Sequence, residues 1–203
     1  DEFKTNILLN RTNDGFTLLQ SAVTNGKIDL INLVVQWYHP EELRNTDEFK
    51  TNILLNQTDD GFTLLQSAVT NGNIELIHLV VQWYDQARLL NTKAFKTKIL
   101  LNSTKAGFNI YHQAGMTLKL RESGEFLEWI KSLLTSKEIR TLLSSKTNRG
   151  FSPGNPRNPE MNKYISDLRA ECQEAAHPGG GRPGDRTGYQ RQGRGRGRGR
   201  GRG

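Results

Sequence analysis

The stretch TDDGFTLLQSAVTNGNIEL, residues 58–76, stands 46 residues earlier in the chain as TNDGFTLLQSAVTNGKIDL, residues 12–30. Residues 1–46 and 47–92 are identical at 36 of 46 positions, so one structural unit is present at least twice. A fixed period of this length is typical of arrays whose units pack on one another. The repeat therefore decides the fold class before any site is considered.

Each unit shows the pattern of two antiparallel helices. Thr63 is placed to cap the first helix, and the apolar residues after it fall on one side: Leu64, Leu65, Ala68 and Val69. The dipeptide Asn71-Gly72 ends this helix, because glycine adopts the left-handed conformation that a helix end needs. A second helix follows with its own apolar stripe: Ile74, Ile77, Val80, Val81 and Tyr84. Two short helices cannot bury these faces alone, so we expect neighbouring units to stack.

The rest of each period, NTDEFKTNILLN at 45–56, predicts a third short helix. Thr46 would cap it, and Asp47 and Glu48 would lie at the positive end of its dipole. Asn56 is placed to end it. The competing interpretation is an extended connection to the next turn.

Two further copies follow in a diverged form. The third keeps TKAGFNIYHQA at 104–114, and we expect a longer connection, GMTLKLRESGE, before the apolar segment EFLEWIKSLL. A fourth begins at TNRGFSP, residues 147–153, and the pattern MNKYISDLRAECQEA after it predicts a helix. The predicted organisation is repeat 1 at 1–46, repeat 2 at 47–92, a divergent repeat 3 at 93–146, a degenerate terminal repeat or cap at 147–176, and a tail at 177–203.

The order T-x-x-G-F-T-L-L-x-x-A-V-x-N-G-x-I-E-L resembles the ankyrin repeat. The match covers Gly61 at the turn, Ala68 in the first helix, Asn71-Gly72 between the helices and Glu75 in the second. Leu18 and Leu64 replace the proline of that family, Gln20 and Gln66 replace its histidine, and the period of 46 exceeds the usual 33. The fold expected is all-α, an ankyrin-like helical repeat solenoid with a disordered Arg/Gly tail. The longer period keeps the armadillo and HEAT classes as an alternative.

The resemblance implies protein binding through the turn tips and the exposed side of the first helix. Carried over by position, the candidate protein-binding residues are Asn13, Asp14, Phe16, Thr24, Asn25, Asp59, Asp60, Phe62, Thr70, Asn71, Lys105, Ala106, Phe108, Asn148, Arg149 and Phe151. The phenylalanines recur directly after each turn glycine. A row of this kind predicts either a binding stripe or rings that fold back and pack each turn.

Little in the sequence predicts catalysis. The histidines His39, His78, His112 and His177 lie far apart without carboxylates or cysteines at ligand spacing, so we expect no metal, no cofactor and no enzyme activity. His112 is interpreted as a hydrogen-bonding turn residue. Trp37-Tyr38 and Trp83-Tyr84 are expected to close the core between units. The sequons at Asn10, Asn56 and Asn102 recur because the unit recurs, and we expect no glycosylation there.

The tail holds the net charge of the chain. Residues 182–203 carry eight arginines and one aspartate, whereas the 20 basic and 20 acidic residues of 1–181 cancel. The tail resembles the RG boxes of RNA-associated proteins, whose guanidinium groups pair with phosphates and stack on bases. This resemblance predicts contact with RNA or another polyanion through Arg182, Arg186, Tyr189, Arg191, Arg194, Arg196, Arg198, Arg200 and Arg202. A solubility role and an incidental tract are the alternatives.

The single cysteine, Cys172, excludes an intrachain disulfide and favours an intracellular location, cytoplasmic or nuclear. No run of 18 apolar residues indicates a membrane span. The leading hypothesis is a non-enzymatic scaffold that binds a protein partner through its repeats and RNA through its tail. The alternatives are a pure protein-interaction module with an inert tail, and a secreted, host-directed effector of a symbiont or parasite.

Overall fold

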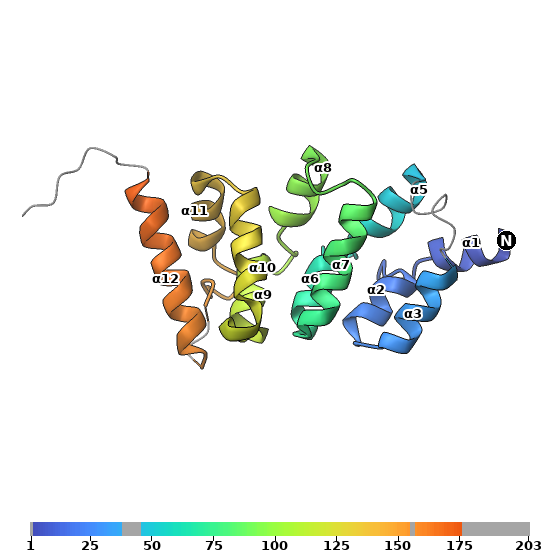
Figure 1. Cartoon of the computed structure of the whole chain (residues 1–203), viewed down its shortest axis with the longest axis horizontal. Helices are drawn as coiled ribbons and strands as arrows, with labels where there is room; N and C mark the ends of the chain where they lie inside the picture. The colour runs from blue at the N-terminus through green and yellow to red at the C-terminus, as the bar shows by residue number, and fades with distance from the viewer. Residues whose placement is uncertain (1, 38–45, 155–156, 176–203) are drawn as a thin grey trace, which may run out of the picture.

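The computed structural model describes residues 2–37, 46–154 and 157–175, and this part of the chain is all-α (Figure 1). It contains no strand, only isolated antiparallel bridges. The helices follow one another as a row of packed pairs, with α1 at one end and α12 at the other. In chain order they are α1 (Glu2–Leu9), α2 (Leu18–Thr24), α3 (Ile28–Trp37), α5 (Asp47–Phe49), η1 (Lys50–Leu54), α6 (Leu64–Asn71), α7 (Ile74–Gln86), α8 (Lys93–Phe95), η2 (Lys96–Leu100), α9 (Ile110–Thr117), α10 (Leu120–Leu133), α11 (Ser136–Ser144) and α12 (Pro159–Glu174).

The two-helix pattern of the second unit is confirmed. Thr63 caps α6 through a reciprocal capping box with Gln66, and α6 ends at Gly72 with φ of 82°. Asn73 caps α7 by accepting hydrogen bonds from the first amides of that helix. The sequence between Thr63 and Asn73 therefore contains both the start and the stop signals of α6.

The apolar stripes form one continuous core. The predicted residues of α6 are fully buried, and in α7 Ile77, Val80 and Tyr84 are buried while Ile74 and Val81 are half-buried. Helix α6 packs between α2 of the unit before it and α9 of the unit after it. The Tyr84 hydroxyl donates to the carbonyl of Leu54 at 2.9 Å, and Trp83 is also buried, so this aromatic pair closes the core as expected. Tyr38 and the Trp37 side chain lie outside the described residues.

The third short helix is also confirmed, and the extended connection is wrong. Thr46 caps α5, which continues into the π-helix η1, where the amide of Leu55 donates to the carbonyl of Lys50 at 2.8 Å. The π turn places both Ile53 and Leu54 in the core. The same arrangement recurs in α8 and η2.

The helix ends at Leu54 with Leu55 as its cap, one residue before the predicted Asn56. The Asn56 amide nitrogen donates to the carbonyl of Gly15 at 3.2 Å and to Gln20 Oε1 at 3.4 Å, both in the preceding unit. Asn102 repeats this contact, with bonds of 2.7 Å to the Gly61 carbonyl and 2.9 Å to Gln66 Oε1. The asparagine therefore joins two units, which explains why it recurs.

The expected long connection in the third unit is wrong. Helix α9 runs to Thr117 and α10 begins at Leu120, so residues 115–125 are almost entirely helical. Gly115 is a packing residue: a Cβ at this position would lie 2.9 Å from the backbone nitrogen of Gly154. The buried Leu118 anchors the short link between the two helices.

The last part of the chain closes the row. Helix α11 precedes the fourth turn, in the place that α5-η1 and α8-η2 take before theirs, and the predicted final helix is α12. Helix α12 packs on α11 and α10. An ion pair of 2.8 Å between Lys131 and Glu171 and a bond of 3.1 Å from the Tyr164 hydroxyl to Glu128 hold it to α10.

Candidate protein-binding surface

Four turns of the same geometry lie within the described residues. In each, the turn threonine accepts a hydrogen bond on its hydroxyl from the amide of the phenylalanine four residues later. The turn glycines, Gly15, Gly61, Gly107 and Gly150, all have φ between 78° and 84°. A side chain is strained in this region, so the spacing Thr-x-x-Gly-Phe follows from backbone geometry.

The turns are joined by a ladder of backbone hydrogen bonds, called here the turn ladder. The carbonyl oxygens of Asp14, Asp60 and Ala106 accept from the backbone amides of the next turn at 3.0, 2.8 and 2.9 Å; these amides belong to Asp59, Lys105 and Asn148. A Cβ on Gly15, Gly61 or Gly107 would face the backbone of the next turn; on Gly107 it would lie 2.9 Å from Thr147 Cα. The four tips therefore form one continuous edge of the molecule.

Side chains at one position of the first helices reinforce the ladder. Gln20 donates to the carbonyl of Phe62 at 2.9 Å, and His112 Nε2 lies 3.1 Å from the carbonyl of Phe151. Glutamine thus makes the inter-unit contact that histidine makes in the third unit. Gln66 also bonds to the next unit, but through a different acceptor: its amide nitrogen donates to the carbonyl of Asn102 at 3.2 Å.

The predicted tip residues are exposed along the turn ladder. Asn13, Asp14, Asp59, Asp60, Lys105, Ala106, Asn148 and Arg149 all have exposed side chains. The charge of the tips changes sign along the edge, from aspartates in the first two turns to Lys105 in the third and Arg149 in the fourth. A partner that crosses the whole edge therefore meets an acidic half and a basic half.

The predicted residues at the ends of the first helices divide into two kinds. Thr24 and Asn25 bond to the backbone of their own helix α2, and the Asn71 amide donates to the carbonyl of Thr24 at 3.3 Å. Their polar groups therefore serve the packing of α2 and α6. Thr70 is exposed, and it lies seven residues along the chain from Thr63, which begins α6, so it is about 10 Å from the tips.

The row of phenylalanines is not uniform. Phe16, Phe62 and Phe108 are half-buried, and the Phe108 ring packs edge-on against the His112 ring at 5.9 Å between centroids. Phe151 is 60% exposed. Packing therefore accounts for much of the first three rings, whereas Phe151 presents most of its ring to solvent.

Phe151 lies in a groove of about 1000 Å³ at the end of the turn ladder, called here the terminal groove. Apolar side chains from two units line it: Phe108, Met116 and Phe151. Met116 is 56% exposed. The described residues of the lining are Ala106, Phe108, His112, Met116, Asn148, Arg149, Gly150, Phe151, Ser152, Gly154 and Arg157. These described residues include two cations and no carboxylate, and an exposed apolar groove of this size is typical of a binding site.

His112 forms a polar part of the groove wall. Its Nδ1 accepts the amide of Asn109 at 3.3 Å, so the proton lies on Nε2, which faces the carbonyl of Phe151. Burial lowers the pKa of His112 below its usual value, and the bond to Phe151 opposes this shift in part. The neutral imidazole therefore fits the groove as a hydrogen-bonding residue, as expected from the sequence.

Sequence reasoning missed Met116, the most exposed apolar residue of the groove after Phe151. Met116 occupies the position of Thr70 and Thr24, one and two periods earlier. The change from threonine to methionine at an exposed helix end was visible by alignment of the copies. In the third unit the two predicted classes, tips and helix ends, therefore meet in one groove.

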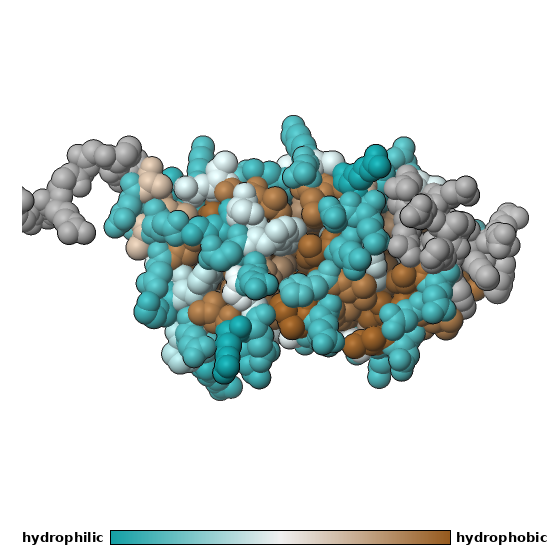
Figure 2. Space-filling view, in the orientation of Figure 1, coloured by the Kyte–Doolittle hydropathy of each residue, from teal (hydrophilic) through white to brown (hydrophobic). Residues whose placement is uncertain are grey.

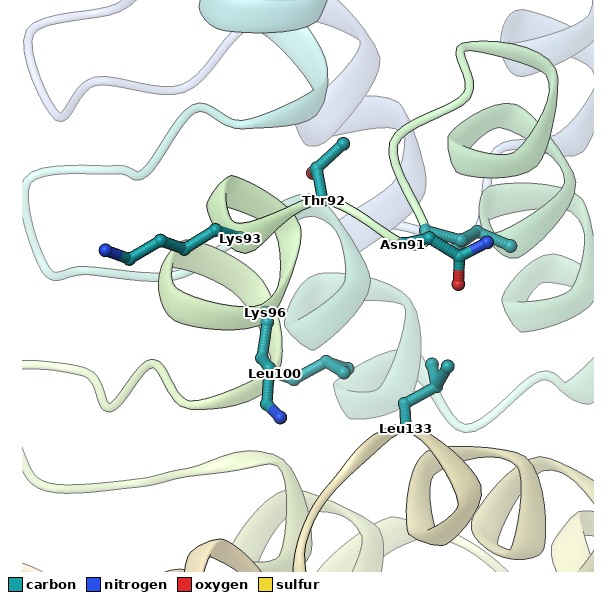
Figure 3. Close-up of a pocket in the computed structure, with 7 residues that line it drawn as sticks. Asn91, Thr92, Lys93, Lys96, Leu100 and Leu133 are labelled. Carbon is teal, nitrogen blue, oxygen red and sulfur yellow. The ribbon is translucent and has the colours of Figure 1, made fainter.

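A second, smaller pocket of about 340 Å³ lies beside α8 and η2 (Figure 3). Leu100 points toward Leu133 of α10, whereas Lys93 extends away from the pocket. Lys96 already pairs with Glu138 at 2.8 Å. Lys96 is thus engaged within the protein, and the terminal groove is the better candidate.

A third apolar surface lies on α3. Ile28, Leu30 and Leu33 are 37 to 44% exposed. Hydrophobic atoms gather over α3 and α7 in the lower right of Figure 2, between hydrophilic side chains. Ile28, Leu30 and Leu33 line neither of the two pockets described above.

The remaining predicted chemistry has no counterpart in the described chain. The arginines of 182–202 and Tyr189 lie outside the described residues, as do His39 and His177. Among residues 2–37, 46–154 and 157–175, no cluster of three histidine, cysteine or acidic side chains is placed to hold a metal. No helix in those same ranges has the length and apolar character needed to cross a bilayer.

No protein-family model and no curated protein sequence matches the chain.

Proposed function

We propose that the protein is a non-enzymatic interaction module, built as an ankyrin-like helical repeat solenoid, that binds a partner protein through its turn edge. The turn ladder, the paired helices and the alternation of the two in sequence support the ankyrin-like interpretation. The observation that carries the function is the terminal groove. It is lined by Phe151 and Met116, which come from two neighbouring units and are 60% and 56% exposed. Large apolar side chains in a concave surface are typical anchors of protein interfaces.

Affinity capture with the full chain tests the proposal. The groove variant Met116→Lys/Phe151→Asp removes both exposed apolar side chains, and its matched control, Ile28→Lys/Leu33→Asp, makes the same changes on α3. We expect proteins captured by the wild type to be lost from the groove variant and retained by the control, with unchanged circular dichroism in both. Capture of the same proteins by wild type and groove variant would reject the terminal groove as the binding surface.

We also propose that the tail tethers the module to RNA or another polyanion. Eight arginines within residues 182–203 favour this, because each phosphate contact releases counterions and makes binding steeply salt-dependent. The comparison is between the full chain and a variant in which those arginines are replaced by glutamine. Unchanged RNA retention and salt dependence in the variant would favour the alternative, an interaction module with an inert tail.

A further inference from the structure

The turn ladder ends with an open backbone acceptor. In the first three turns the residue before the glycine gives its carbonyl oxygen to the amide of the next turn. Arg149 holds this position in the fourth turn, and within the described residues no hydrogen bond reaches its carbonyl oxygen. A backbone carbonyl of this kind can accept a hydrogen bond from another chain, as the unpaired carbonyls of an outer β-strand can.

The space next to this acceptor is also open. A Cβ on Gly15, Gly61 or Gly107 would meet the following turn at 2.9 to 3.2 Å, whereas a Cβ on Gly150 would have nothing within 4 Å. Gly150 is at the same time a lining residue of the terminal groove. The groove therefore occupies the place that the backbone of a next turn takes elsewhere in the molecule.

The side chains around this place select the chemistry of an occupant. Phe151 and Met116 offer apolar contact, and among the described residues of the lining Arg149 and Arg157 carry charge. A basic segment is repelled there, which argues against the protein's own tail with its eight arginines. An apolar side chain accompanied by a carboxylate matches both parts of the surface.

We propose that the terminal groove binds an extended acidic peptide segment of a partner protein, which adds one rung to the turn ladder. A backbone amide of the segment donates to the Arg149 carbonyl, an apolar side chain lies against Phe151 and Met116, and a carboxylate faces the Arg149 guanidinium. Extension of an open backbone edge supplies affinity, and the side-chain contacts supply selectivity. This inference rests on the proposed function and specifies the partner's chemistry.

Synthetic peptide mixtures and the full chain test it directly. One mixture of acetylated octapeptides has a fixed central phenylalanine flanked by aspartates, and the other has the same phenylalanine flanked by lysines. We expect the acidic mixture to bind at least about tenfold more tightly than the basic one. One peptide from the acidic mixture is then N-methylated at each backbone amide in turn. We expect methylation of one amide, the one that donates to the Arg149 carbonyl, to abolish binding.

Two charge reversals provide the matched comparison. Arg149→Glu changes a cation that lines the groove, and Lys105→Glu makes the same change one turn away, outside the lining. We expect Arg149→Glu to weaken binding of the acidic peptide at least about tenfold and Lys105→Glu less than about threefold, because screening is strong between exposed charges. Thermal unfolding of both variants shows that each remains folded.

The outcomes separate this inference from the proposed function. Equal binding of the two mixtures, equal losses in the two variants, or no sensitivity to N-methylation overturns it. If no peptide binds but partner capture still depends on Met116 and Phe151, the interaction module stands and the peptide rung is rejected. Sedimentation that shows self-association competing with the peptide would assign the groove to a second copy instead.

Discussion

Gly107 and Gly150 form a natural pair for measuring what the turn ladder contributes to stability. Both have left-handed backbone, with φ of 84° and 81°, so alanine at either site costs about 1 to 2 kcal/mol in strain. Alanine also lowers the conformational entropy of the unfolded chain, which offsets about 0.4 to 1 kcal/mol of this strain. Gly150→Ala is therefore expected to destabilise by about 1 kcal/mol, since its Cβ enters open space.

Gly107→Ala adds a collision that Gly150→Ala lacks. The new Cβ would lie 2.9 Å from Thr147 Cα and 3.1 Å from the Lys146 carbonyl oxygen, so the fourth turn must move away. This overpacking costs about 1 to 3 kcal/mol, and loss of the 2.9 Å bond from the Asn148 amide to Ala106 costs about 1 kcal/mol more. The expected difference between the two variants is about 2 to 4 kcal/mol.

Urea unfolding of the full chain, followed by circular dichroism at 222 nm, measures this difference. For a domain of this size it corresponds to a Tm lower by roughly 4 to 16 °C in Gly107→Ala than in Gly150→Ala. An unchanged m value shows that the same surface unfolds in both variants. Equal stability losses would mean that the turns are not held against one another, and the ladder argument would be refuted.

Three further substitutions probe individual contacts. His112→Gln is expected to keep the inter-unit bond and to remove a pH dependence of stability. Burial lowers the native pKa of His112, so the unfolded state binds more protons below about pH 6.5 and the stability of the wild type falls there on acidification. Thermal melts of both proteins between pH 5 and 8 measure this difference. Tyr84→Phe removes the buried bond to the Leu54 carbonyl and should cost about 1 to 2 kcal/mol in urea unfolding; no loss would show that the bond is replaced. Gln66→Ala removes a buried side chain and should destabilise the protein by about 2 to 4 kcal/mol. Gln57 is exposed and makes two similar inter-unit bonds, so Gln57→Ala should cost less than about 1 kcal/mol. Equal losses in urea unfolding would contradict the role of burial.

The helix pairs could be predicted because their signals are local. Thr63 begins α6 and Gly72 ends it, and both act through their own backbone geometry within a few residues. The stripe of buried residues in α7 follows the helical period for the same reason. Local propensity and tertiary packing agree in these segments, so the sequence suffices.

The errors arose where a distant contact decides the local structure. The segment GMTLKLRESGE was expected to be a connection, yet its first residue, Gly115, lies inside α9, where its missing side chain lets the Gly154 backbone approach. Asn56 was expected only to end a helix, yet its amide group also bonds to the preceding unit. The π turns in η1 and η2 carry no local signal, since packing of Ile53 and Leu54 decides the backbone there.

The candidate site was predicted in outline only. The tips were found because the turn glycines mark them, and the structure shows them exposed along one edge. Their convergence with Met116 in one groove depends on how α9 sits against the fourth turn, which no spacing in the sequence expresses. An apolar residue at an exposed helix end acquires meaning only with its neighbours in place.

The backbone bonds of the turn ladder use equivalent atoms at the three junctions described above, and this makes the molecule open to recombination. If residues 47–92 were excised, Thr46 would be followed by Lys93, and the carbonyl of Asp14 would face the amide of Lys105 instead of that of Asp59. Asn102 would take the partner that Asn56 has now. Unequal crossing-over within the near-identical copies can thus shorten or extend the array by whole units of 46 residues while the joints stay intact, leaving evolution free to change the tips one at a time.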